Sequence, residues 1–207
     1  KIAMKDLEIR GAGNLLGEQQ HGHMEAVGYD LYCKMLNEAV KTLKGTKKLA
    51  EDFNTYVDMD VDAFIPPSYI VNEAQKLDIY KRIAGIENQG ECNDMKEELL
   101  DRFGEVPGAV ENLLRIAMIR VRAHRLYMTE VKGRGGEIRF LLKPDAKIRA
   151  ERIPELLKKQ EKLTFNPKGT PFFLFRYKRC QMAERDAQML LEFTEKLLES
   201  MESLLLS

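Results

Sequence analysis

The spacing of apolar residues changes abruptly near residue 126, and this change limits the chain to a small number of folds. Upstream, apolar side chains recur every three or four residues over 71–84, 92–103 and 107–126, a period typical of amphipathic helices. Downstream, apolar and polar residues alternate over 128–132 and 137–143, as expected for two strands of a hairpin with a glycine-rich turn. Helices and strands separated into runs favour an α+β domain over a doubly wound sheet.

The flanking segments extend this prediction. Residues 55–62 alternate in the manner of a half-exposed strand, and 163–165 and 172–178 predict two more strands around a Pro-Lys-Gly turn. Residues 148–159 predict a short helix, and 184–205 predict a long closing helix with one apolar stripe. We therefore expect a compact α+β domain with about five helices and a small, largely antiparallel sheet.

Single residues mark the expected ends of these helices. Gly104 suits a left-handed C-cap after 92–103, and Pro107 suits the first position of the next helix. Val71 opens the apolar stripe predicted for the first helix, and Pro154 must be tolerated in the first turn of its helix.

Net charge is zero, but charges of opposite sign are segregated along the chain. Residues 1–50 carry 8 Lys/Arg and 6 Asp/Glu, 51–104 carry 5 and 13, 105–180 carry 18 and 8, and 181–207 carry 2 and 6. Segregated charge raises the local potential, which suits docking within the molecule or binding to a polyanion. Alternatively, the acidic and basic stretches face each other inside one domain.

The basic stretch places several cationic side chains on the predicted helix 107–126 and on the hairpin. These residues are Arg115, Arg120, Arg122, Arg125, Lys132, Arg134 and Arg139. Non-specific contact with nucleic acid is one interpretation. No aromatic platform interleaves them, and acidic residues lie a few dozen positions upstream, so pairing within the protein is the favoured one.

Candidate metal sites in the sequence are incomplete. His21 and His23 have no further ligand at a suitable spacing, and Asp58, Asp60 and Asp62 lack the closing turn and distal glutamate of a calcium loop. A solvated strand face or an acidic docking edge explains the aspartates better. We expect no metal site, and we find no arrangement of nucleophile, base or paired carboxylates that predicts an independent enzyme.

Composition points to a cytoplasmic globular protein. The chain is 44% hydrophobic, and no apolar run approaches the roughly 20 residues needed to span a membrane. Cys33, Cys92 and Cys180 lie far apart, so neither a disulfide framework nor a zinc site is expected. Buried or incidental thiols are the simpler prediction.

A glycine-rich segment near the start predicts a functional loop. It reads D-L-x-x-R-G-x-G-x-x-L-G-x-x-Q-x-G from Asp6 to Gly22. Its key residues are Arg10, Gly11, Gly13, Gly17, Gln20 and Gly22. The segment lacks the G-x-x-x-x-G-K-S/T pattern of a phosphate-binding loop, so this chain alone should not act as an ATPase. Its guanidinium suits recognition of phosphate or carboxylate.

This pattern resembles the translocation motif of two double-stranded DNA motors, the bacterial transcription-repair coupling factor and its branch-migrating helicase relative. Further stretches over 28–40, 63–66, 80–84 and 98–104 resemble the C-terminal end of the coupling factor. The resemblance covers almost the whole chain and weakens after about Lys132. Because the motif begins almost at once, we expect an excised fragment of a longer protein.

The resemblance implies two parts. Residues 1–49 would be the end of a helicase-type translocase with the motif and a following helix, and 50–207 the C-terminal regulatory domain. Arg10 and Gln20 would act at the DNA and couple ATP hydrolysis to translocation that displaces stalled RNA polymerase. A histidine stands at position 21 where the family more often has a small hydroxyl residue.

The resemblance also implies cofactors and partners. ATP and Mg²⁺ would bind elsewhere in the parent protein and not in this fragment. RNA polymerase, UvrA and double-stranded DNA would be partners of the parent, and the C-terminal domain would pack on the N-terminal UvrA-binding module, masking it and restraining the motor. Two alternatives remain for 50–207: a basic nucleic-acid-binding accessory module, and a stability module without a regulatory role.

Overall fold

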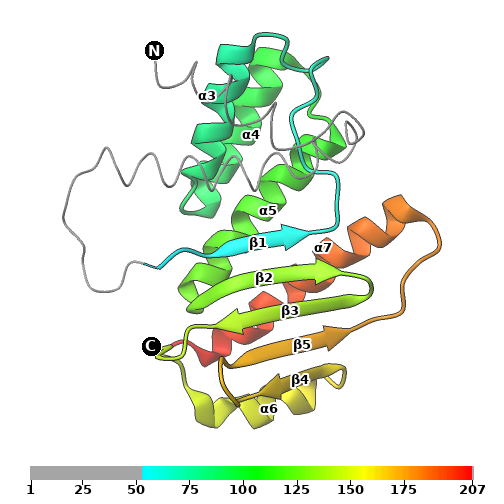
Figure 1. Cartoon of the computed structure of the whole chain (residues 1–207). Coiled ribbons are helices and arrows are strands. Elements are labelled where there is room, and N and C mark those ends of the chain that lie inside the picture. The colour runs from blue at the N-terminus through cyan, green and yellow to red at the C-terminus, as the bar shows by residue number, and fades with distance from the viewer. Residues whose placement is uncertain (1–52, 207) are drawn as a thin grey trace, which may run out of the picture.

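A five-stranded sheet lies at the centre of the structure, a computed structural model that describes residues 53–206 (Figure 1). Its strand order is β1-β2-β3-β5-β4. The strands are β1 (Tyr56–Met59), β2 (Met128–Arg134), β3 (Glu137–Leu142), β4 (Leu163–Asn166) and β5 (Phe172–Arg176). Only the β1 and β2 pair is parallel, and the other three pairs are antiparallel, so the predicted largely antiparallel sheet is confirmed.

Two glycines form the turn of the β2–β3 hairpin. Gly135 and Gly136 have φ of 65° and 84° and are the only residues between the two strands. Positive φ at both central positions is the requirement of the tight turn that matches the twist of a hairpin. Strand β2 is longer than predicted, since Gly133 and Arg134 pair with Ile138 and Glu137 of β3 rather than lying in the turn.

Five α-helices accompany the sheet within residues 53–206, as expected. They are α3 (Glu73–Ala84), α4 (Gln89–Phe103), α5 (Gly108–Arg125), α6 (Ile153–Lys159) and α7 (Ala183–Met201). Short 3₁₀ turns at Ala150–Arg152 and Glu202–Leu204 precede α6 and follow α7. Pro154 is tolerated because it stands in the first turn of α6, where its missing N–H removes no helical hydrogen bond.

The observed ends of α3 and α4 differ from the prediction in three details. The first helix begins after Asn72, whose side chain caps it, so Val71 lies outside the helix and is 80% exposed. α4 begins one turn earlier than predicted because Asn88 accepts a hydrogen bond from the amide of Glu91. Gly104 has the expected positive φ of 86°, but its ψ of −160° is outside the left-handed helical region.

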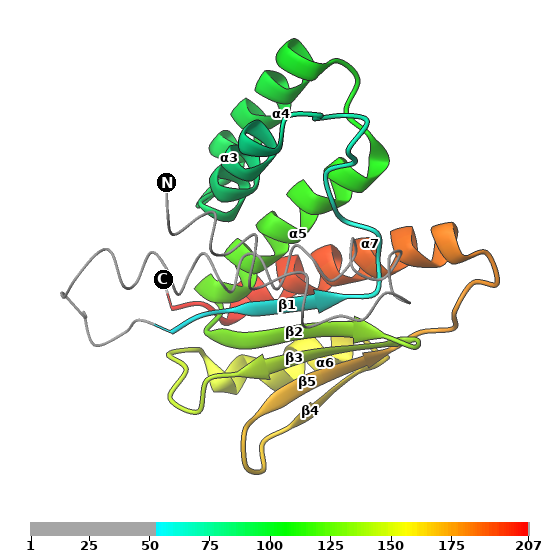
Figure 2. The ribbon, with the colours of Figure 1, turned by 45° about the horizontal axis from the view of Figure 1, so that its top comes forward.

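The core lies between one face of the sheet and the long helices α5 and α7 (Figure 2). Gly133 allows the closest approach, because a Cβ there would lie 2.7 Å from Leu190 Cδ1 and 3.0 Å from Met59 Sδ. Phe140 and Phe173, neighbours across β3 and β5, are fully buried. The opposite face of the sheet is not covered by any helix in the described part of the chain (Figures 1 and 2).

Candidate docking surfaces

The residues of the predicted translocation motif lie outside the described part of the chain. These are Arg10, Gly11, Gly13, Gly17, Gln20 and Gly22, together with His21, His23 and Cys33. The predicted boundary between 49 and 50 also falls there. The roles assigned to these residues therefore remain predictions.

The aspartates of the predicted strand 55–62 face away from the core. Val57, Met59 and Val61 are buried, while Asp60 and Asp62 are exposed, which is the alternation predicted from the sequence. The strand itself ends at Met59, earlier than predicted. Among residues 53–206, no group of three histidine, cysteine or acidic side chains is placed to hold a metal ion.

Arg115 joins α5 to α7. Its Nε and Nη2 each donate to a carboxylate oxygen of Glu195 at 2.8 Å, and Nη1 donates to Gln188 Oε1 at 2.7 Å. The hydrogen bonds from Arg115 to Glu195 raise the pKa of the guanidinium further above its usual value. All of the charge-bearing nitrogens are used inside the molecule, so Arg115 is a structural tie between two helices.

Arg120 is also used internally, since it donates to the main-chain oxygen of Ala84 at the end of α3. Pairing within the protein is thus confirmed for two arginines of the basic helix. The prediction that the acidic partners lie a few dozen residues upstream is wrong for Arg115, because its partner Glu195 lies 80 residues downstream. The sequence does carry a signal for this partner, because Glu192, Glu195 and Glu199 follow one another at helical spacing.

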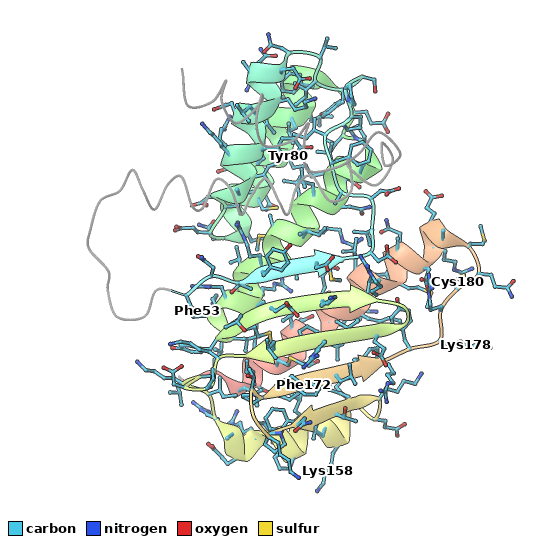
Figure 3. All side chains as sticks on the ribbon, in the orientation of Figure 1. Phe53, Tyr80, Lys158, Phe172, Lys178 and Cys180 are labelled. Carbon is cyan, nitrogen blue, oxygen red and sulfur yellow. The ribbon has the colours of Figure 1, made fainter. Side chains whose placement is uncertain are left out.

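The hairpin cations lie on the uncovered face of the sheet. Arg139 stacks over the Phe172 ring with 4.2 Å between guanidinium carbon and ring centre, and Arg134 is 4.0 Å from Asp58. Lys132 is exposed on the same face. Figure 3 shows Phe172 on this side of the sheet. These contacts are weak ones, so the cations remain accessible to a partner.

One carboxylate of the acidic stretch, that of Glu98, forms ion pairs with two arginines. Glu98 on α4 accepts from Arg82 of α3, with one contact at 2.6 Å, and from Arg102 Nη1 at 2.6 Å. The Arg82 hydrogen bond, followed by that of Arg102, lowers the pKa of the Glu98 carboxyl to about 2. This network ties α3 to α4 and leaves the rest of the acidic helix unneutralised.

Three other carboxylates form what we call the acidic ridge of α4: Asp94, Glu97 and Asp101. They are exposed, and their i, i+3, i+7 spacing places them on one helical stripe. Within residues 53–206 none of the three takes part in an ion pair. Leu100 beside the ridge is 53% exposed. An exposed leucine among unpaired carboxylates is typical of a surface that meets a basic or mixed partner.

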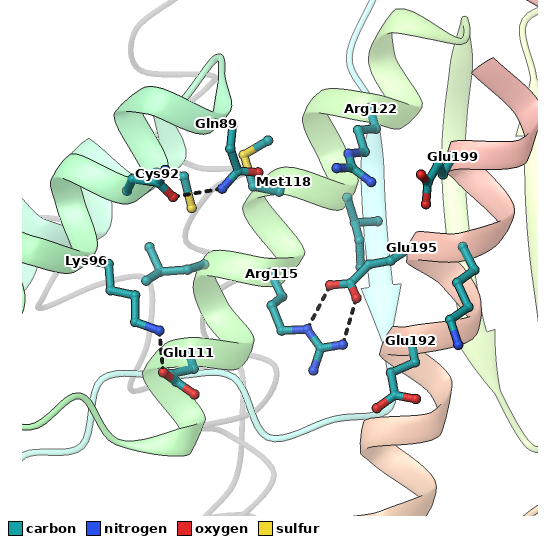
Figure 4. Close-up of a pocket in the computed structure, with 14 residues that line it drawn as sticks. Gln89, Cys92, Lys96, Glu111, Arg115, Met118, Arg122, Glu192, Glu195 and Glu199 are labelled. Carbon is teal, nitrogen blue, oxygen red and sulfur yellow. Dashed lines mark hydrogen bonds and ion pairs between the residues drawn. The ribbon is translucent and has the colours of Figure 1, made fainter. Parts of the chain in front are cut away.

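A groove of about 480 Å³ runs over α5 between α4 and α7 (Figure 4). Its floor comes from Leu114, Met118 and Ile119 of α5. Cys92 lines the α4 side, and its burial raises the pKa of the thiol; it is one of the buried thiols that the sequence predicts. Charged side chains of both signs line the α7 side.

The fold and these surfaces define a class, namely an α+β domain with segregated acidic and basic surfaces. The family model described as the TRCF domain matches residues 59–153. The chain is 45% identical over 147 residues to the transcription-repair-coupling factor of Staphylococcus epidermidis, and 43% identical over 146 residues to that of Bacillus subtilis. The chain belongs to the transcription-repair coupling factor family, and its described part is the C-terminal TRCF domain.

A solved structure supports the same assignment. The crystal structure of the C-terminal domain of a transcription-repair coupling factor matches with a TM-score of 0.59 and 28% identity, over 73% of this chain and 96% of that one. The matches to the two factors each cover 70% of this chain, but only 13% and 12% of the relatives. The chain therefore spans about an eighth of the length of these relatives.

None of the helices in residues 53–206 is both long enough and apolar enough to cross a membrane.

Proposed function

We propose that this chain is the C-terminal part of an ATP-dependent double-stranded DNA translocase that acts in transcription-coupled nucleotide excision repair. The observation that carries the proposal is the family assignment together with the match to almost all of a separately solved C-terminal domain. The parent would bind ATP and Mg²⁺ upstream of this chain. RNA polymerase, UvrA and double-stranded DNA would be its partners.

In this proposal, residues 50–207 restrain the motor by packing on the N-terminal UvrA-binding module. The acidic ridge of α4 is the surface best suited to this contact, because its carboxylates are exposed and unpaired while Glu98 behind it is already neutralised. Allosteric couplings of this kind are typically about 1 to 3 kcal/mol, which three surface charges are able to supply in part.

The ridge is tested by charge reversal in a full-length factor that carries this C-terminal region. The variant Asp94→Lys/Glu97→Lys/Asp101→Lys should raise DNA-independent ATPase activity and affinity for UvrA. A matched variant, Glu151→Lys/Glu155→Lys/Glu161→Lys, changes net charge equally at and beside α6 and should leave both unchanged. If both variants behave as the unmodified protein does, the electrostatic part of the proposal fails.

The role of the translocation motif needs a separate test. Arg10→Ala and Gln20→Ala should leave DNA-stimulated ATPase activity largely intact while displacement of polymerase and of a triplex strand falls, because coupling and not hydrolysis is removed. An equal loss of hydrolysis and displacement would indicate general structural damage instead.

A second candidate function is direct binding of nucleic acid by the domain. The exposed Lys132, Arg134 and Arg139 on the uncovered sheet face favour it, whereas the internal use of Arg115 and Arg120 weighs against it. Binding of the chain to duplex DNA with an affinity that falls steeply as salt rises would support this candidate.

A further inference from the structure

We propose that the uncovered face of the sheet binds single-stranded DNA, with bases along one row of side chains and phosphates along the next row. The proposal rests on the second candidate function, nucleic-acid binding by the hairpin cations. It goes further by naming the state of the strand and the side chains that meet each part of it. Three observations support it: the openness of the face, a like-charged pair at its centre, and an aromatic row beside that pair.

The face is open across all five strands. No helix of the described part of the chain covers it, as the two views of the ribbon show (Figures 1 and 2). Successive side chains of a strand point to opposite faces, so the strand register determines which side chains form rows across this face. Neighbouring members of one row are about 4.8 Å apart, and neighbouring rows are about 7 Å apart.

The central row contains two cations that lie directly opposite each other. Lys132 of β2 pairs in register with Arg139 of β3, and both side chains are exposed. Like charges at directly opposite positions destabilise a sheet. Asp58 is the neighbour of Lys132 on β1, but its ion pair, at 4.0 Å, is with Arg134. Within residues 53–206 Lys132 forms no ion pair, so an anionic partner would relieve the repulsion in this row.

The adjacent row, two residues along the strands, is largely aromatic and apolar. Its members are Tyr56, Glu130, Leu141 and Phe172, on four successive strands of the sheet. Tyr56 is 40% exposed, and Leu141 and Phe172 are partly exposed. The sequence shows no aromatic residue among the hairpin cations, because the two rings come from β1 and β5 and only the register brings them beside the hairpin.

Arg139 connects the two rows. Its guanidinium carbon lies 4.2 Å from the centre of the Phe172 ring, so the planar cation lies over the ring. Nucleic-acid bases stack on aromatic rings and on guanidinium planes, which makes this pair a platform for a base. A duplex keeps its bases stacked inside and presents phosphates to a flat surface. An acidic peptide supplies the charge without a base to stack, so a single strand uses both rows best.

The order of the rows places the two sides of the strand. A single strand laid across the sheet with its bases on the Phe172 row has its phosphates next to Lys132. Glu130 lies in the base row, where a carboxylate accepts hydrogen bonds from the amino groups of bases. The proposed parent acts on DNA, so we assign the ligand as single-stranded DNA rather than RNA.

Fluorescence anisotropy with the whole chain tests the proposal. The probes are a labelled single strand of about 12 nucleotides of mixed adenine and cytosine, and the duplex of the same sequence. The single strand should bind at least about tenfold more tightly than the duplex, because only its bases are free to stack. The affinity for the single strand should fall as the salt concentration rises.

Two variants separate the rows. Lys132→Ala should weaken binding and reduce the slope of log affinity against log salt by about 0.7, the value for one phosphate contact with a single strand. Phe172→Leu keeps an apolar side chain but removes the ring, so it should weaken binding about tenfold without changing the slope. Lys158→Ala is the matched control, because it removes an exposed cation from α6, on the other side of the sheet, and should bind as the unmodified chain does. Thermal unfolding of each variant shows that the fold is retained.

The outcomes distinguish this proposal from the functions on which it rests. Equal affinity for the single strand and the duplex overturns it and leaves the second candidate function intact, whereas absence of binding to either overturns both. Unchanged binding by Lys132→Ala and Phe172→Leu also overturns it, as does displacement of the strand by polyglutamate at the same concentration of charge. Tighter binding of RNA of the same sequence overturns the assignment to DNA. None of these outcomes depends on ATPase activity, so they are distinct from a failure of the proposed restraint.

Discussion

Two cation-rich regions of this domain use the same residue types in opposite ways. On α5, Arg115 and Arg120 are directed inward, to Glu195 of α7 and to the end of α3. On the hairpin, Lys132, Arg134 and Arg139 lie on the uncovered face of the sheet. The sequence shows both regions as one basic stretch. The comparison teaches that a run of charge predicts a charged surface only where no other element of the chain covers it.

The hairpin should depend most strongly on its glycines. Gly136→Ala places a Cβ 2.9 Å from the Tyr177 carbonyl oxygen at a φ of 84°, so we expect a loss of about 2 to 3 kcal/mol in unfolding free energy. Gly135→Ala, with a φ of 65° and open space around it, should lose only about 1 kcal/mol. Denaturant unfolding measures both, and equal losses would show that the close approach at Gly136 does not matter.

Arg115 should contribute more to stability than any cation on the hairpin. Arg115→Met keeps the length of the side chain but leaves Glu195 without its partner, which should cost about 1 to 2 kcal/mol. Arg125→Met, on the exposed side of the same helix, should change stability by less than about 0.5 kcal/mol. A loss no larger for Arg115→Met than for Arg125→Met would break the comparison.

On α4, the contribution of the paired carboxylate Glu98 to stability should depend on pH. Because the folded pKa of Glu98 is lowered to about 2 from 4.5, its stabilisation is present above pH 4.5 and is lost as the pH falls towards 2. Glu98→Gln should therefore cost about 0.5 to 1 kcal/mol at neutral pH, and the difference should shrink below pH 4.5. A difference between Glu98→Gln and the unmodified protein that stays constant from pH 7 down to pH 2.5 would contradict this assignment.

The smallest effect is expected on the open sheet face. Arg139→Leu removes only the stacking of a guanidinium on the partly exposed Phe172 ring, so about 0.5 kcal/mol or less should be lost. The loss is measured by thermal unfolding of the Arg139→Leu and Arg115→Met variants side by side, and the two melting temperatures are compared. A larger loss for Arg139 than for Arg115 would mean that the hairpin cations are structural and not available to a partner.

The local part of the fold was predictable because it rests on local signals. Helix and strand periods gave the element order, and the two glycines gave the hairpin turn. Two features had weaker signals: the capping by Asn88 adds a turn to α4, and the absence of a Cβ at Gly133 admits Leu190 against the sheet. Both depend on neighbours that a period does not reveal.

The candidate surfaces were predictable only in part. The acidic stretch was visible in the sequence, but its division into a neutralised Glu98 and an exposed ridge depends on how α3 packs on α4. The groove likewise exists only because α4 and α7, far apart in sequence, lie on either side of α5. Tertiary packing decides such features, and no spacing rule within one helix contains them.

The central claim is that residues 50–207 restrain the motor of the parent protein. It is tested most directly by comparing DNA-independent ATPase activity of a full-length factor with that of a version ending at Leu49, at matched folded concentration. The account predicts a marked rise in activity on truncation. No change, or a fall, would contradict it and would leave the domain as an accessory binder or a structural support.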